Sequence, residues 1–233
     1  MTDYMDDADE WRMSGQAPCG TAYRVIADYP FAPVEAEVRE RIRQALSPTT
    51  GASVGDTSSV EACPLPWYDH YAMFRVTDAS WSNPRTGLYF LGLPDGTDLH
   101  RLPGISAPIH DVNAKAPVKL TEANVVDYMR FFSFFVRGGE GPFMIVDDPD
   151  DPFLPDSPQT REVLMDIARP PSREGMKDKG HFLVDAVVYY SDAAFIANMA
   201  VHPDGMVEML DDEPIAADLD QKVDQPLKLP EED

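Results

Sequence analysis

The segment from Thr121 to Val146 constrains the fold more than any other part of the sequence, because large apolar side chains are densest there. They recur three and four positions apart, the spacing of one helix face, and aromatic residues widen that face. The remaining polar strip is narrow. We therefore expect a central helix over about residues 121–137 that buries most of its surface, with Thr121 as its N-cap. A glycine pair then predicts a sharp turn into an interior strand.

Short strands are predicted on both sides of this helix. Before it, apolar runs flank a Pro-Asp-Gly turn sequence. After it, two runs of alternating apolar residues are joined by Ser191-Asp192, and a third follows another Pro-Asp-Gly turn, which predicts an antiparallel meander. The predicted strands are Tyr68–Thr77, Leu88–Leu93, Leu99–Leu102, His181–Tyr190, Ala193–Val201 and Met206–Leu210.

The other segments give weaker signals. Apolar residues at helical spacing predict an amphipathic helix over about 33–46, and a second, short helix is expected over 159–168. The mixed segment 108–120 is interpreted as an edge strand, residues 22–28 as a short strand, and 171–179 as a charged loop. Strands outnumber helices, so the expected class is α+β: a mainly antiparallel sheet with two or three helices packed on one side.

The predicted domain organisation is one folded unit with acidic ends. Residues 1–20 are expected to form a disordered acidic tail, and 215–233 a second acidic tail. The interval 21–214 is expected to be a single α+β domain. Within it, residues 47–66 are rich in small polar residues and predict a flexible loop.

Charge limits the kinds of partner. With 41 acidic against 19 basic residues, the formal net charge of the 233-residue chain is -22. Such a surface repels phosphate backbones and anionic lipids, so we expect neither nucleic acid nor membrane as a partner, whereas a basic protein fits. The first residues lack the basic and apolar regions of a secretory signal, and only two cysteines occur. A cytoplasmic location is therefore expected.

Catalytic motifs are missing from the sequence. No paired-histidine zinc spacing, nucleophile elbow or phosphate-binding glycine loop occurs, so we predict no cofactor, no metal and no catalytic residue. Two alternatives stay open. The acidic run Asp147–Asp151 follows a predicted strand and could hold a hard cation. His100 and His110, with Asp111, could face each other across a hairpin as a metal or acid-base site.

Five residues are candidates for binding. Trp67, Tyr71 and Trp81 belong to an aromatic-rich block that could line a binding surface or simply form core. Arg130 and Arg137 lie on the polar strip of the central helix. They could form a subsite for an anion, or each could pair with a nearby carboxylate such as Asp127.

Two function classes follow. The first is a non-enzymatic, acidic interaction or accessory protein, similar in its properties to an immunity protein that masks a basic partner. The alternative is a hydrolase or metal-dependent enzyme whose site is assembled from distant residues, among them His110, Asp111 and the aspartates after Val146.

Overall fold

The computed structural model of the chain describes residues 29–50, 54–83, 86–151, 153–155, 157–176, 180–221 and 227–228. The predicted tail 1–20 and the predicted strand 22–28 lie outside these residues. The described part combines four helices with antiparallel sheets, so the expected α+β class is confirmed.

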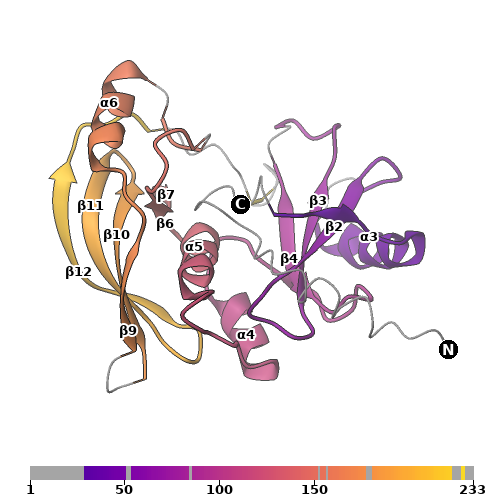
Figure 1. Cartoon of the computed structure of the whole chain (residues 1–233). Helices are drawn as coiled ribbons and strands as arrows, with labels where there is room; N and C mark the ends of the chain where they lie inside the picture. The colour runs from indigo at the N-terminus through magenta and orange to yellow at the C-terminus, as the bar shows by residue number, and fades with distance from the viewer. Residues whose placement is uncertain are drawn as a thin grey trace.

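The strands form two large sheets (Figure 1). The N-terminal sheet is a meander whose strands pair in chain order: β1 (Ala32–Pro33), β2 (Ser59–Pro64), β3 (Ala72–Thr77), β4 (Leu88–Gly92) and β5 (His100–Arg101). The C-terminal sheet has the order β12 (Val207–Ala216), β11 (Ala193–Val201), β10 (Phe182–Tyr190) and β8 (Met144–Ile145), with β9 (Ser172–Met176) also paired to β10. A small hairpin joins β6 (Arg137–Gly138) to β7 (Gly141–Pro142).

Helices separate and cover the sheets. In Figure 1, α4 (Ala107–Lys115) and α5 (Val125–Phe135) lie between the two large sheets, α3 (Ala36–Thr50) lies on the far side of the N-terminal sheet, and α6 (Pro158–Ile167) lies at one end of the C-terminal sheet. The sequence predicts helices packed on one side of a single sheet, and this detail is wrong. The described helices lie on different sides of two large sheets. Tertiary contacts decide which strands pair, and the periodicity of the sequence does not predict these contacts.

The N-terminal sheet buries both of its faces. All five residues of β4 are buried, and they alternate between two cores because successive side chains of a strand point to opposite faces. Leu88 and Phe90 belong to the cluster beneath α3, whereas Tyr89 and Leu91 belong to the large cluster that contains α5.

Helix α5 forms the centre of the molecule, as predicted. Ten of its eleven residues are buried, which is what a narrow polar strip requires. It is shorter at both ends than the predicted 121–137. Thr121 is not its N-cap; Asn124 is, and the Asn124 side chain accepts a hydrogen bond from the Thr121 backbone N–H at 2.8 Å.

The predicted C-terminal meander is confirmed. β10 and β11 pair over nine residues each around the Ser191-Asp192 turn, and β12 pairs with β11. Val184, Ala186 and Val188 share one face with their partners on β11, and these three residues are buried in the large cluster together with Ala197 and Met199.

Three local predictions are wrong. Strand β2 lies within the predicted loop 47–66, pairs with both β1 and β3, and contributes Val60 and Cys63 to the core. Helix α4 replaces the predicted edge strand 108–120, because Pro108 occupies the first turn, where its missing N–H costs nothing. Strand β9 lies within the predicted charged loop 171–179. Its sequence has no apolar residue up to Gly175 and does not predict a strand, but pairing with β10 stabilises one there.

The predicted tail 215–233 is also partly wrong. Strand β12 extends to Ala216, and the side chains of Leu219 and Leu227 are 8% and 3% exposed within the large core cluster. The Asp220 carboxylate accepts hydrogen bonds from Ser157 and Thr160 at the start of α6. Burial of Leu219 and Leu227 therefore contributes to holding the described part of this acidic segment on the fold.

A buried polar network links the β11–β12 turn to the middle layer. The Tyr68 hydroxyl donates to Asn113 Oδ1 at 2.5 Å, and the Asn113 amide donates to the Tyr128 hydroxyl at 3.2 Å and to the Asp204 carbonyl at 3.0 Å. Tyr128 in turn donates to the Gly205 carbonyl at 2.7 Å. Because each of these buried groups is satisfied by another, the turn is fixed against α4 and α5.

None of the helices in the described ranges is long and apolar enough to cross a membrane.

Candidate functional site

The two tryptophans among the predicted binding residues are core residues and do not share a surface. Trp67 is fully buried and packs against Tyr128 and Phe131 with ring centroids 5.4 Å apart. Trp81 is 7% exposed and belongs to the cluster beneath α3, on the opposite face of the N-terminal sheet. The structure therefore supports the core interpretation for both.

Tyr71 belongs to a polar cluster at the surface. Its hydroxyl donates to Asp98 Oδ2 at 2.5 Å. The Lys115 ammonium group donates to both oxygens of Asp98, at 2.6 and 2.9 Å, and lies 3.1 Å from Nε2 of His100. His100 is thus brought to Asp98 and Lys115, whereas His110 packs its ring against Phe132 at a centroid distance of 5.9 Å.

The charges in this Tyr71 cluster stabilise one another. The Lys115 and Tyr71 hydrogen bonds lower the pKa of Asp98 to about 2. Burial and the Asp98 carboxylate raise the pKa of Tyr71 to about 12. Asp98 also has a φ of 49°, in the left-handed region that costs energy for a residue other than glycine. The polar groups of this cluster bond to one another and so stabilise the turn at Asp98.

Arg130 lies in a buried ion-pair network. Its guanidinium group donates to Asp127 at 3.1 Å and to Asp147, and each of the three side chains is at least 88% buried. Two carboxylates around one guanidinium group leave a net negative charge. This arrangement favours the structural alternative for Arg130 over an anion subsite.

Arg137 lies over an aromatic ring at the end of α5. Its guanidinium carbon is 4.9 Å from the centroid of Phe134, and its Nε donates to the Phe134 carbonyl at 3.3 Å. The side chain also covers Gly104, whose carbonyl accepts a hydrogen bond from the Arg137 backbone. These contacts fasten the end of α5 to the loop before α4.

The acidic run after β8 is used internally. Asp147 pairs with Arg130, Asp150 pairs with Arg161, and Asp148 and Asp151 accept hydrogen bonds from backbone N–H groups two residues further on. Within the described ranges, no three His, Cys, Asp or Glu side chains form a group that could hold a metal ion. The run has the geometry of a turn.

The longest strand of the described residues is the edge strand β12, which lies at the far left of Figure 1. It has ten residues, all of them exposed or half-buried, and pairs with β11 on one side. Among the residues that the structure describes, no strand pairs with its other side. An edge of this kind presents a row of backbone N–H and C=O groups that can accept a further strand.

Acidic residues line this edge strand. Glu208, Asp211 and Glu213 lie opposite Ala200, Asn198 and Ile196, so they share one face of the sheet, and Asp212 lies on the other face opposite Ala197. The pairing of β11 with β12 shifts its register between Ala194 and Phe195 and between Asn198 and Met199, as at a β-bulge. No basic residue occurs within β12.

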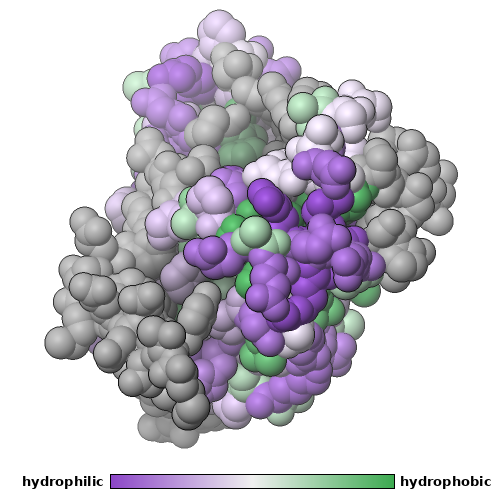
Figure 2. Space-filling view, turned by 90° about the vertical axis from the view of Figure 1, so that its right-hand side faces the viewer, coloured by the Kyte–Doolittle hydropathy of each residue, from purple (hydrophilic) through white to green (hydrophobic). Residues whose placement is uncertain are grey.

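Three large apolar side chains accompany the carboxylates. Met206 in the preceding turn is 47% exposed, and Met209 and Leu210 within β12 are 37% and 49% exposed. The face of the molecule that carries α3 is different, because hydrophilic side chains dominate it in Figure 2 and its exposed residues form ion pairs such as Arg41–Glu37. We call Met206–Ala216 the acidic edge.

Sequence reasoning identifies β12 only up to Leu210 and does not assign it a role. The acidic character of this strand is visible in the sequence, because four acidic residues and no basic residue follow the predicted hairpin turn. Comparison of the chain with protein-family models, with curated proteins and with solved structures gave no match.

Proposed function

We propose that this chain is a protein-interaction module that binds an extended, basic segment of a partner protein along the acidic edge. The observation that carries this proposal is the outer side of β12, which no strand of the described residues pairs with. This ten-residue strand has four carboxylates and exposed apolar side chains. An incoming strand gains main-chain hydrogen bonds from such an edge, and side chains on alternate positions supply specificity.

Charge selects the kind of strand that binds. A second copy of β12 would place like charges opposite one another, which destabilises a strand pair. A segment with lysine or arginine on alternate positions would instead face Glu208, Asp211 and Glu213 on one face of the sheet. The net charge of -22 would also accelerate the encounter with a basic partner.

The apolar side chains distinguish recognition from simple protection of the edge. Charged residues and bulges on an edge strand can serve only to prevent aggregation. That role requires no exposed apolar surface, and large apolar side chains on the edge oppose it. Met206, Met209 and Leu210 therefore support a contact surface, because they add apolar area that becomes buried when a partner binds.

The test begins with site-specific photocrosslinking in lysate of the source cells. A photoreactive residue replaces Leu210 on β12 or, as a matched control, Met165, which is 61% exposed on α6. A partner captured from Leu210 and absent from Met165 is then purified. Amide hydrogen exchange in its complex should show protection along residues 207–216, since an added strand pairs with the outward N–H groups.

Charge reversal tests the selectivity. The double variant Asp211→Lys, Glu213→Lys should lower the association rate of that partner by about tenfold or more, and salt above about 0.1 M should weaken binding to the unmodified chain. Glu162→Lys with Asp166→Lys is the control, because both residues are exposed on α6. Equal effects of the two double variants, or a rate independent of salt, would show that the acidic edge is not the recognition surface.

The second candidate function is a hydrolase, and one observation favours it. Tyr71, Lys115 and the pair Asp98 and His100 come from three separate segments and meet at Asp98, whose backbone is strained. We rank it second because these groups are bonded mainly to one another. Turnover of a generic ester or phosphoester that Asp98→Asn abolishes, with folding intact, would reverse this order.

A further inference from the structure

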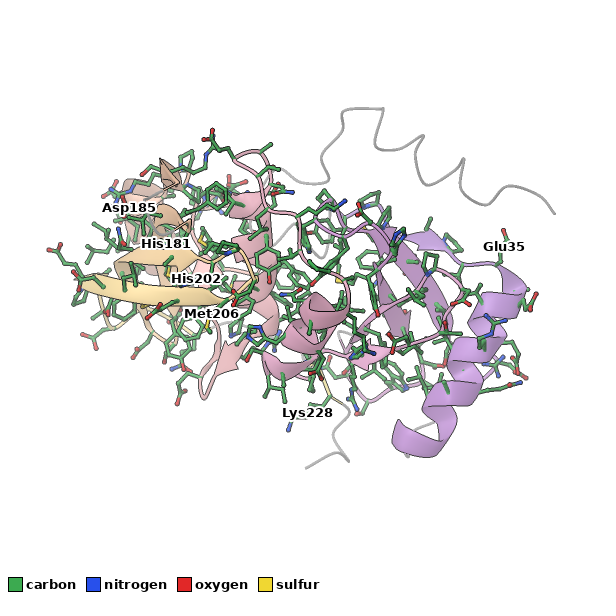
Figure 3. The ribbon with its side chains drawn as sticks, turned by 90° about the horizontal axis from the view of Figure 1, so that it is seen from below. Glu35, His181, Asp185, His202, Met206 and Lys228 are labelled. Atoms are coloured by element: carbon green, nitrogen blue, oxygen red, sulfur yellow. The ribbon has the colours of Figure 1, made fainter. Side chains whose placement is uncertain are left out.

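Two histidines far apart in the sequence form a pair at the end of the C-terminal sheet. The register of β10 and β11 ends with Phe182 opposite Val201, which places His181 opposite His202. Their ring centroids are 5.4 Å apart. Figure 3 shows both histidines next to Met206, at the β11–β12 turn.

This spacing fits two imidazoles that share one metal ion. A zinc–nitrogen bond to histidine is about 2.0–2.1 Å long, and two rings bound to one tetrahedral ion consequently have centroids roughly 5 Å apart. The strand register places both side chains on one face of the sheet, and the rings lie near that separation without an ion. Pre-organisation of this kind removes part of the cost of assembling a site.

A carboxylate supports one of the two rings. Glu208 Oε2 lies 3.3 Å from Nε2 of His202. A carboxylate that accepts the N–H of a ligating histidine fixes the orientation of the ring and leaves its other nitrogen free to bind. Glu208 is thus suited to hold His202 with Nδ1 available.

The turn that carries His202 is rigid. The His202 backbone N–H donates to the Met206 carbonyl at 2.8 Å, and the Met206 N–H donates to Asp204 Oδ1 at 3.0 Å. The buried network fixes the same turn through the carbonyls of Asp204 and Gly205. Local motion would therefore change the separation of the two rings little.

We propose that His181 and His202 bind a divalent first-row transition metal ion, with Glu208 as the hydrogen-bonding partner of His202. Imidazole nitrogen suits Zn²⁺, Ni²⁺ and Cu²⁺, whereas Mg²⁺ and Ca²⁺ prefer oxygen ligands. Because no third histidine, cysteine or carboxylate completes a metal-binding group among the described residues, water fills the remaining positions and the ion exchanges readily. The acidic surface raises the local concentration of cations.

Calorimetric titration of the full-length chain with Zn²⁺, Ni²⁺ and Mg²⁺ tests the site. We expect Zn²⁺ and Ni²⁺ to bind at the pair, with Mg²⁺ unable to compete. His181→Gln and His202→Gln should each weaken Zn²⁺ binding at least about tenfold, and Glu208→Ala about tenfold, the effect of losing a hydrogen-bonding partner of a ligand.

His70→Gln and His110→Gln are the matched controls, because His70 is exposed and His110 is half-buried elsewhere in the fold. Both should bind Zn²⁺ like the unmodified chain. Imidazole NMR signals of His181 and His202 should shift with Zn²⁺, a readout that does not depend on a variant's folding. Unshifted signals, or equal affinity in His181→Gln, His202→Gln and the unmodified chain, would overturn the proposal.

Discussion

The N-terminal sheet ends on both sides in strands of only two residues, β1 and β5, whereas one side of the C-terminal sheet ends in the ten-residue β12. The N-terminal sheet also buries both faces, one beneath α3 and one toward α5. Short edges offer few free backbone groups, and buried faces offer no contact surface. The two sheets therefore differ in their edges: the N-terminal sheet ends in short strands, whereas the C-terminal sheet ends in a long strand with no described partner on its outer side.

The largest expected effect lies in the layer between the sheets. Phe135 of α5 packs against Tyr89 of the N-terminal sheet at 5.2 Å and against Phe131 and Phe134 at 5.1 Å. Phe135→Ala should lower the free energy of unfolding by roughly 3–5 kcal/mol, because it leaves a cavity in a close-packed core. Urea unfolding measures this change. Met165→Ala at the surface should cost less than about 0.5 kcal/mol, and similar losses in both would contradict the layered core.

The next effect concerns the attachment of the β11–β12 turn. Gly205 has a φ of 83°, and a Cβ there would lie 2.3 Å from Asn113 Nδ2 and 2.4 Å from the Tyr128 hydroxyl. Gly205→Ala should therefore cost roughly 2–4 kcal/mol, since backbone strain adds to a broken buried network.

Gly180→Ala separates these two causes. Gly180 also has a positive φ, 75°, but the nearest atom to its Cβ would be 3.9 Å away. Its substitution should cost only about 1–2 kcal/mol, which is the backbone strain alone. Equal losses in the two variants, measured by urea unfolding, would show that the network contributes little.

Acid should weaken the N-terminal sheet. Hydrogen bonds from Ser58, Ser80 and Thr57 lower the pKa of Asp78, after β3, from 3.8 to about 2. A folded-state pKa below the unfolded value contributes stability above about pH 4, and this contribution is lost as the pH falls toward 2. We expect the loss to be about 1–2 kcal/mol. Asp78→Asn should flatten this part of the pH profile of urea unfolding; an unchanged profile would assign the acid sensitivity elsewhere.

The smallest effect on stability is expected at the acidic edge. Leu210→Ser removes an exposed side chain at a bulged position and should change the free energy of unfolding by less than about 0.5 kcal/mol. Binding of the partner should nevertheless weaken measurably. A stability loss above 1 kcal/mol would instead mean that Leu210 belongs to the core of the C-terminal sheet.

The parts of the fold that the sequence predicts are local. Alternation in β10 and β11 around Ser191-Asp192, and the helical spacing within α5, each involve residues close in the chain. The division into two sheets does not follow from such patterns, because it depends on long-range pairing. Strand β2 is not predicted because only Val60 and Cys63 in it are buried, which leaves a weak alternation. Helix α4 is not predicted because its proline and polar residues give a weak helical pattern.

The candidate sites show the same limit. An aromatic-rich segment predicts burial well, but it does not say that Trp67 and Trp81 face opposite sides of a sheet. The histidine pair was within reach, since counting outward from the Ser191-Asp192 turn places His181 opposite His202. The cluster around Asp98 could not be predicted from the sequence, because it depends on the position of Lys115 on α4.

The position of α5 between the two sheets has a consequence for synthesis of the chain. During synthesis α5 leaves the ribosome before β10, β11 and β12 do, so the side of the helix that faces the C-terminal sheet lacks these strands at that stage. Exposed apolar surface on a nascent chain is what chaperones bind and what aggregates. A truncated chain that ends before β10 would therefore expose phenylalanines that are buried in the full-length protein. Premature termination of translation should consequently favour aggregation.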